Sequence, residues 1–172
     1  MERAELVHLG IYCRDVEVLR KFYTEVFGLV VTDEGNTRIG YLVFLTSDPA
    51  EHHQLVLVSG RAPDQKSTVN QISFRLKSLT DLREMRDLLD KRGVAFRPVD
   101  HGIAWSLYIE DPEGNGIEVY VDAPWSIAQP YGKPLDLDKS NDEIMAATEA
   151  MCRSEPSYRT RREWEDAQRR KF

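Results

Sequence analysis

The sequence predicts an α+β fold: two tandem βαβββ modules that form a cupped, half-barrel mixed sheet, followed by a C-terminal helical extension. Two stretches of the chain each show the order strand, helix, strand, strand, strand in their hydrophobic periodicity. Matching landmarks in the two stretches are 63 residues apart, as in His8 and Gln71, Asp15 and Ser78, and Asp48 and Asp111. Three landmarks at one spacing indicate an internal repeat of structure.

Domain boundaries follow from this repeat. The modules cover residues 4–60 and 68–122 within a domain of residues 1–124, and the extension covers residues 125–172. With 172 residues, of which 41% are hydrophobic and 30% charged, the chain is long enough to bury a real core. We expect the apolar row of each sheet to face its module helix and the other row to face inward across the joined sheets.

Composition excludes several functional classes. A formal net charge of −6 argues against a dedicated nucleic-acid binder, and no apolar run reaches the length of a membrane span. The first residues lack the apolar core of a secretion signal, so we expect a cytoplasmic protein. Cys13 and Cys152 lack the spacing of a redox or metal motif and are expected to be reduced, structural thiols.

The first module shows alternating and helical patterns in turn. We expect a strand over residues 6–12, then a helix that begins after the N-cap Asp15 and stops at Gly28. Further strands are expected over residues 29–32 and 40–46, around a polar turn of residues 33–38, and a last one over residues 54–58.

The second module repeats this order. Strands are expected over residues 70–76 and 94–99, with a helix between them that starts at the capping-box spacing of Ser78 and Asp81 and ends at Gly93. Residues 102–121 read as a hairpin, because two alternating runs flank the turn formers DPEGNG. Alternation places Tyr108 on one face of its strand and Glu118 on one face of the partner strand.

The extension does not repeat. Residues 122–139 hold three prolines and predict a surface loop, followed by a helix over residues 140–153 that opens with the capping box of Ser140 and Glu143. Its expected buried side chains are Ile144, Met145, Thr148 and Met151. Residues 160–171 predict a charged helix anchored by Trp164, which is either a solvated tail or a dimer clamp or pocket lid.

Three inward-facing side chains on separate strands could hold a metal ion. His8, Gln71 and Glu118 offer an imidazole nitrogen, an amide oxygen and a carboxylate oxygen. Spacing alone leaves the ordinary alternative open, in which the histidine is structural and the glutamate faces solvent.

A histidine pair precedes the last strand of the first module. Adjacent strand residues point to opposite faces, so only one of His52 and His53 should enter the cavity. That histidine could act as a general acid or base, whereas the simpler interpretation is an exposed turn pair. Tyr108 could hydrogen-bond an anionic ligand oxygen, or serve only as an aromatic rim contact.

Four segments resemble the vicinal oxygen chelate superfamily, which includes glyoxalase I, type I extradiol dioxygenases and bleomycin- or fosfomycin-resistance proteins. They are HLGIYCRDVEVLRKFYTEVFGL, HHQLVLVSG, NQISFRL and WSLYIEDPEGNGIEVYVDAP, within residues 6–124. The DPEGNGIEV string is the most specific to the superfamily. The His-His run and the spacing between Tyr108 and Glu118 are most similar to the ring-cleaving extradiol dioxygenases.

The resemblance implies a role for each candidate. His8 and Glu118 match two iron ligands, and Gln71 falls where the dioxygenases have a second histidine ligand. His53 matches the histidine that handles the substrate proton and bound oxygen, with His52 beside it, and Tyr108 matches the tyrosine that binds the catecholate. Glyoxalase I enzymes accept a glutamine ligand, so the departure at Gln71 does not exclude a metal.

Three hypotheses follow from the resemblance. The first is an extradiol dioxygenase-like enzyme of aromatic catabolism that uses Fe(II). The second is a glyoxalase-like isomerase or lyase that uses Zn(II), Ni(II) or Mn(II). The third is a non-catalytic small-molecule-binding protein. In each case we expect a small-molecule ligand and a homodimer, with no nucleic-acid or membrane partner.

Overall fold

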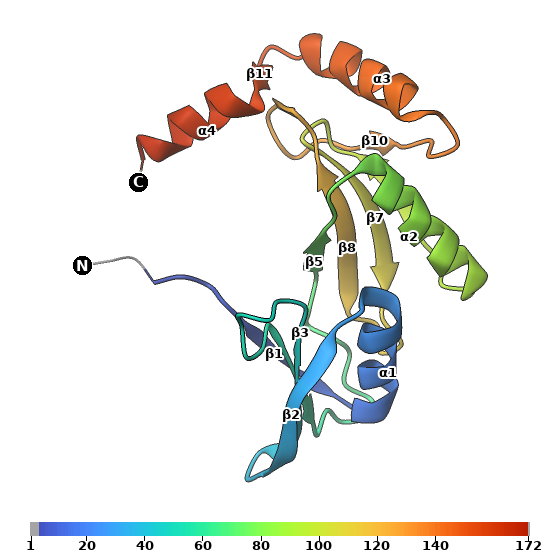
Figure 1. Cartoon of the computed structure of the whole chain (residues 1–172), viewed down its shortest axis with the longest axis vertical. Coiled ribbons are helices and arrows are strands. Elements are labelled where there is room, and N and C mark those ends of the chain that lie inside the picture. Colours follow the sequence, from blue (N-terminus) through green and yellow to red (C-terminus); the bar gives the residue numbers. More distant parts are fainter. Residues whose placement is uncertain (1–3, 172) are drawn as a thin grey trace. The chain divides into compact units, whose positions relative to one another are not determined.

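The computed structural model describes residues 4–171, so the outer ends of the two predicted domains, residues 1–3 and 172, lie outside it. The chain forms two compact units (Figure 1). Unit 1 contains residues 1–70 together with Glu110–Asn115, and unit 2 contains Gln71–Ile109 and Gly116–Phe172. No helix among the described residues is both long and apolar enough to traverse a bilayer.

Unit 1 holds a four-stranded mixed sheet in the order β1-β4-β3-β2, with β1 parallel to β4. Its strands are β1 (Leu9–Cys13), β2 (Val30–Thr37), β3 (Gly40–Thr46) and β4 (Leu55–Ser59). Helix α1 (Val16–Phe27) buries an apolar stripe that includes Leu19 and Tyr23. Asp15 caps it by accepting from the backbone N–H of Glu17 and Val18, and Gly28 ends it in the left-handed conformation.

Unit 2 holds a five-stranded sheet in the order β10-β6-β7-β8-β5, with β5 parallel to β8. Its strands are β5 (Ile72–Arg75), β6 (Arg97–Asp100), β7 (Ala104–Glu110), β8 (Gly116–Asp122) and β10 (Lys133–Pro134). Helix α2 (Leu79–Lys91) packs its stripe of Leu82 and Leu89 in the core of this unit. Its N-cap Ser78 accepts from the backbone N–H of Asp81, as the capping spacing predicts.

The two modules share one topology, which confirms the predicted repeat and the α+β class. The order β1-β4-β3-β2 corresponds strand for strand to β5-β8-β7-β6, and neither sheet closes into a barrel. Helices α1 and α2 start at Val16 and Leu79, at the predicted spacing. The pairing register shifts by one residue at the last strand, since Leu9 pairs with Leu55 whereas Ile72 pairs with Ile117.

Some predicted boundaries were wrong. Residues 33–37 were predicted as a turn but continue β2, which carries a bulge between Val31 and Asp33 and pairs with β3 as far as Thr37. Strand pairing overrides the low strand propensity of this polar segment. The first strand starts at Leu9 rather than residue 6, so His8 precedes it.

The C-terminal extension is part of unit 2 and packs there through helix α3 (Asn141–Arg153), whose predicted capping box of Ser140 and Glu143 is present. Thr148 of α3 is buried, accepts a hydrogen bond from Trp105 Nε1 at 2.8 Å and donates to Asp100 Oδ2 at 2.5 Å. Met145 is 39% exposed, contrary to prediction, because Ile144, Thr148 and Cys152 form the buried stripe instead. Helix α4 (Arg161–Arg169) follows, with no buried residue.

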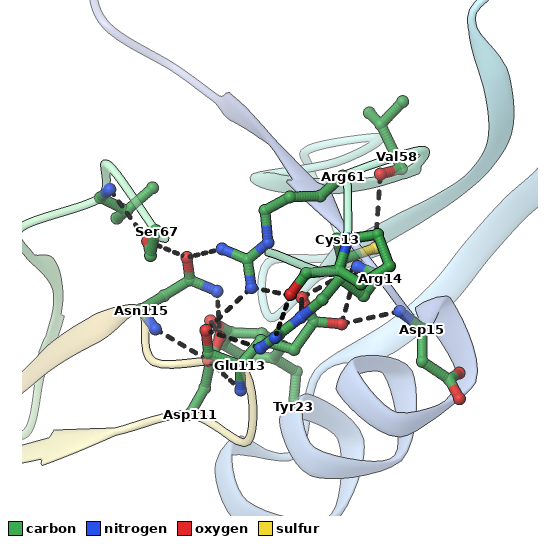
Figure 2. A network of polar contacts seen from close by, with 12 residues as sticks. Cys13, Arg14, Asp15, Tyr23, Val58, Arg61, Ser67, Asp111, Glu113 and Asn115 are labelled. Carbon is green, nitrogen blue, oxygen red and sulfur yellow. Dashed lines mark hydrogen bonds and ion pairs between the residues drawn. The ribbon is translucent and has the colours of Figure 1, made fainter. Parts of the chain in front are cut away.

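A buried polar network ties residues 110–115 to the rest of unit 1 (Figure 2). The Glu113 carboxylate accepts hydrogen bonds from the backbone N–H of Arg14 at 2.8 and 2.9 Å and of Asp15 at 2.7 Å. It also forms an ion pair with Arg61, and both side chains are 4% exposed. Beside it, Asp111 accepts from the Tyr23 hydroxyl at 3.0 Å and from the backbone N–H of Glu113 at 2.9 Å and of Asn115 at 3.0 Å. Each buried charge therefore has a partner of opposite sign or a backbone donor.

We expect the stability of the fold to fall in acid because of Glu113. Burial raises the pKa of this carboxyl, but the N–H groups of Arg14 and Asp15 and the Arg61 guanidinium outweigh burial and hold the pKa below its usual value. A depressed folded-state pKa stabilises the fold above the unfolded value, and this stabilisation is lost as pH falls through the folded value. Urea midpoints at pH 7 and pH 3 would measure the loss, and Glu113→Gln should flatten the dependence. An equally steep pH dependence in that variant would contradict the assignment.

Candidate active site

Glu118 is the centre of the polar cluster in unit 2. It lies in β8 and pairs with Ser73 of β5, so the two side chains share one face of the sheet. Its Oε2 accepts from Gln71 Nε2 at 2.7 Å and from Ser73 Oγ at 3.0 Å. Its Oε1 accepts from Ser106 Oγ at 2.8 Å and from Tyr108 OH at 3.0 Å. Alternation along β7 brings the last two side chains to this face, as the sequence predicted.

These four hydrogen bonds occupy the Glu118 carboxylate, which offers about four lone-pair sites. A cation that binds this carboxylate must therefore replace at least one donor. Gln71 also uses its Nε2 to donate to Ser73 Oγ at 2.8 Å, so its amide nitrogen is committed to hydrogen bonds and its oxygen is the atom left to act as a ligand. An amide oxygen and a carboxylate oxygen are donors that suit hard divalent cations.

His101 joins this cluster, although no motif in the sequence predicted a role for it. Its Nε2 lies 2.9 Å from Tyr108 OH, and its Nδ1 lies 2.5 Å from the Tyr131 carbonyl oxygen. A carbonyl can only accept, so Nδ1 donates a hydrogen to the Tyr131 carbonyl. The Tyr108 hydroxyl has one hydrogen, which it can donate either to Glu118 Oε1 or to His101 Nε2. His101, Tyr108 and Glu118 thus form one row of polar contacts, in which the phenol hydrogen is available to the imidazole at one side and to the carboxylate at the other.

The Tyr108 hydroxyl stays protonated over a wide range of pH. Burial is the main reason that its pKa rises to about 12, and the hydrogen bond to the Glu118 carboxylate and that charge add to the effect. The Arg97 guanidinium, 4.8 Å from the ring centroid, acts in the opposite direction. At neutral pH the phenol is therefore a hydrogen-bond donor.

The other three histidines lie together in unit 1. The ring centroids of His8 and His53 are 4.2 Å apart, and His53 also packs on Phe44 at 5.1 Å. His52 and His53 precede β4 rather than belonging to it, and their Nδ1 atoms are 2.9 Å apart. The expectation that strand alternation would separate the pair was therefore wrong. Burial first, and then the neighbouring His8 and His52, lower the pKa of His53, so a neutral ring is favoured.

The candidate residues divide between the two units. His8, His52 and His53 belong to unit 1, whereas Gln71, Tyr108 and Glu118 belong to unit 2. Within either unit, no three described His, Cys, Asp or Glu side chains gather into a group that could hold an ion. The meeting of His8, Gln71 and Glu118 at one metal ion stays a prediction. Their donor types, one nitrogen and two oxygens, fit a divalent cation.

A cavity of about 600 Å³ opens beside this cluster within unit 2. Tyr108, Glu118 and His101 lie in its wall, and aromatic and aliphatic side chains, including Trp125 and Ile127, line much of the remainder. This volume is in the range of small-molecule sites, which combine a mostly apolar lining with a few polar groups.

Comparison with known proteins agrees with the topology. Residues 5–119 match the model of the Glyoxalase/Bleomycin resistance protein/Dioxygenase superfamily. The chain belongs to this superfamily. The match spans both βαβββ modules as far as the middle of β8 and includes every candidate site residue predicted from the sequence.

Among curated proteins, this superfamily member is similar to two dioxygenases of Rhodococcus globerulus. It is 32% identical over 124 residues to biphenyl-2,3-diol 1,2-dioxygenase 3 and 28% identical over 125 residues to biphenyl-2,3-diol 1,2-dioxygenase 2. These alignments cover 68% and 69% of this chain and 63% of each relative. It is also 29% identical to catechol-2,3-dioxygenase of Bacillus subtilis, with 84% of this chain and 49% of the relative covered. The chain thus spans less than two thirds of the length of these relatives.

Solved structures show the same fold. A glyoxylase/bleomycin resistance protein/dioxygenase domain from Frankia sp. EAN1pec superposes with a TM-score of 0.62 at 22% identity, covering 70% of this chain and 99% of that one. The fosfomycin resistance protein FosX from Listeria monocytogenes, complexed with Mn(II) and sulfate, gives a TM-score of 0.57 at 15% identity, covering 70% and 92%. At these identities the likeness concerns the fold alone.

Proposed function

We propose that the protein is a divalent-metal-dependent enzyme that opens the ring of an aromatic vicinal diol with dioxygen. The observation that supports this most is the row of polar contacts of His101, Tyr108 and Glu118, which faces a largely apolar cavity. Similarity to proteins named as biphenyl-diol and catechol dioxygenases adds support. The metal is Fe(II) in this proposal, as expected for chemistry that uses dioxygen.

Under this proposal, His8, Gln71 and Glu118 hold the cation. The ion would supply the positive charge that binds both diol oxygens and dioxygen. Tyr108, which keeps its proton, donates a hydrogen bond to a diol oxygen next to Glu118. This hydrogen bond favours the ionised diol over the neutral one.

Two histidines can move protons. His101 Nε2 accepts the proton that leaves the diol, either directly or through the Tyr108 hydroxyl, because its other nitrogen already donates to the Tyr131 carbonyl. His53 is neutral in its setting beside His8 and His52 and serves as the second acid or base. In this role, His53 would exchange protons with the oxygen atoms derived from dioxygen.

The direct test is turnover. Protein reconstituted with ferrous iron under nitrogen should, on admission of air, convert 2,3-dihydroxybiphenyl or catechol to a yellow ring-opened product that absorbs visible light. Absence of product across a panel of catechols, with iron shown to be bound, would count against the proposal.

A second candidate is supported by the glutamine. Gln71 replaces an imidazole with an amide oxygen, which favours harder ions such as Mn(II) and a reaction without a change of metal oxidation state, as in an isomerase or lyase. Metal analysis of protein purified without added metal separates the two candidates. Stoichiometric Mn(II), Zn(II) or Ni(II) favours the second, and iron favours the first. Lack of any bound metal would instead favour a binding protein without catalytic activity.

Restoring the imidazole should strengthen iron binding. We expect Gln71→His to raise Fe(II) affinity by about tenfold or more, because imidazole suits Fe(II) better than an amide oxygen does. Changes to the residues around a metal ion typically alter its affinity by about tenfold to a hundredfold. Competition with a chromophoric chelator under nitrogen measures the change. Gln65→His, the same exchange at an exposed loop position, is the matched control. Equal gains in both variants, or no gain at residue 71, would remove Gln71 from the ligand set.

A further inference from the structure

The cavity of unit 2 is longer than one aromatic ring requires. Glu118, Tyr120 and Asp122 alternate along β8 and all three line it. A strand rises about 3.3 Å per residue, so the backbone positions of Glu118 and Asp122 are roughly 13 Å apart. The reacting groups occupy one end of this span, which leaves space beyond a single bound diol ring.

The C-terminal extension supplies part of the cavity wall and reaches it at the Asp122 end, where Arg161 contacts Asp122. Trp125, Ile127 and Trp164 line the cavity, and all three lie beyond the residues that match the superfamily model. Trp125 is 6% exposed and packs edge-on against Trp105 at 6.2 Å, so it is a fixed part of the wall. Trp164 is 39% exposed, so protein atoms cover its ring only in part.

Helix α4 contributes to the cavity wall rather than to a core. It buries no residue, and Trp164 is its large apolar side chain. Pairing of β11 (Arg159–Thr160) with β9 (Trp125–Ser126) anchors its start. Arg161 anchors it further, by donating from its backbone N–H to the Pro124 carbonyl at 2.9 Å and from Nη1 to Asp122 Oδ1 at 2.6 Å. These contacts hold α4, and with it Trp164, at the cavity although no side chain of the helix is buried in a core.

The charge at this end is balanced. Arg161 pairs with Asp122 and donates from Nε to Glu165 Oε1 at 3.1 Å. Arg75 also pairs with Asp122 at 3.4 Å, so two guanidinium groups match two carboxylates. A ligand group that ends here therefore meets aromatic and aliphatic surface with no surplus cation to attract a carboxylate or phosphate. An uncharged aromatic group fits this chemistry, since aromatic side chains favour stacked or edge-on partners.

We propose that Trp164 determines substrate specificity by contacting the distal ring of a two-ring vicinal diol, whose reacting ring lies at Tyr108 and Glu118. This inference rests on the proposed function for the identity of the reacting ring. It assigns substrate selection to the C-terminal extension, in a segment that lies outside the superfamily match.

The test compares a two-ring diol with a one-ring diol on the full chain. Calorimetry under nitrogen would measure binding of 2,3-dihydroxybiphenyl and of catechol to the wild-type protein and to Trp164→Ala. We expect the variant to bind 2,3-dihydroxybiphenyl about tenfold more weakly, equivalent to about 1.4 kcal/mol, and catechol within about twofold. Trp164→Phe should recover most of the affinity, and Arg162→Ala, an exposed change in the same helix, should alter neither ligand.

Each outcome separates this inference from the proposed function. Equal losses for both diols, no loss for either, or failure of the wild-type protein to bind 2,3-dihydroxybiphenyl would overturn the role of Trp164. The expected binding pattern without ring opening in air would leave Trp164 as a selectivity residue and refute the dioxygenase proposal alone. Ring opening with no dependence on Trp164 would do the reverse.

Discussion

Replacing Glu118 with glutamine is expected to lower kcat/KM for ring opening of 2,3-dihydroxybiphenyl by about a thousandfold. The change keeps the shape of the side chain but removes the negative charge that four donors surround. A bound metal ion stabilises charge in the transition state by several kcal/mol. Each loss of about 1.4 kcal/mol lowers the rate tenfold, so loss of the ion should cost about a thousandfold. Steady-state kinetics in air, together with iron content by elemental analysis, measure the effect.

Glu110→Gln is the matched control for this experiment. Glu110 ends β7 in the same hairpin, is exposed, and loses the same charge on exchange. It should keep activity within about twofold, as exposed substitutions away from special features usually do. Near-normal activity and iron content in Glu118→Gln would exclude Glu118 from the metal site.

Replacing Glu113 with glutamine is expected to lower the free energy of unfolding by about 3 kcal/mol. Removing one partner of a buried ion pair leaves the other charge uncompensated, and here that charge is the Arg61 guanidinium. The carboxylate now accepts hydrogen bonds from the backbone N–H groups of Arg14 and Asp15. The NH₂ group of the new amide would face these donors and could not accept from them. Urea denaturation at pH 7, followed by circular dichroism, measures the loss.

Asp64→Asn controls for the loss of one negative charge. Asp64 is exposed in the segment that follows Arg61, and its exchange should change stability by less than about 0.5 kcal/mol. If the two variants unfolded at the same urea concentration, the Glu113 network of Figure 2 would have no net stabilising role.

The sequence predicted those features that depend on neighbours along the chain. The capping box of Ser140 and Glu143, the stop at Gly28 and the hairpin over residues 102–121 all carry local signals, and the structure contains each of them. The constant spacing between landmarks was sufficient to predict the repeated topology. The polar face that joins Tyr108 to Glu118 followed from strand alternation in the same way.

Features that depend on distant contacts escaped prediction. Glu113 lies in a run of turn formers, where a carboxylate is ordinarily solvated, and only its contacts with Arg14 and Arg61 explain its burial. His101 lies in a turn before β7, and the bond from Tyr131 that orients it comes from 30 residues away. The sequence offered one indirect signal for His101: the chain has four histidines, and the motifs accounted for only three of them.

The hairpin tip between β7 and β8 links the two units of the chain. Residues 110–115 complete unit 1 although the strands on either side of them belong to unit 2. The polypeptide therefore passes from the first unit to the second, returns for six residues and leaves again. A gene cut at residue 70 would yield a first half whose buried guanidinium at Arg61 has lost its counter-ion. Although the two halves repeat one topology, we expect the first half to be less stable alone than within the whole chain.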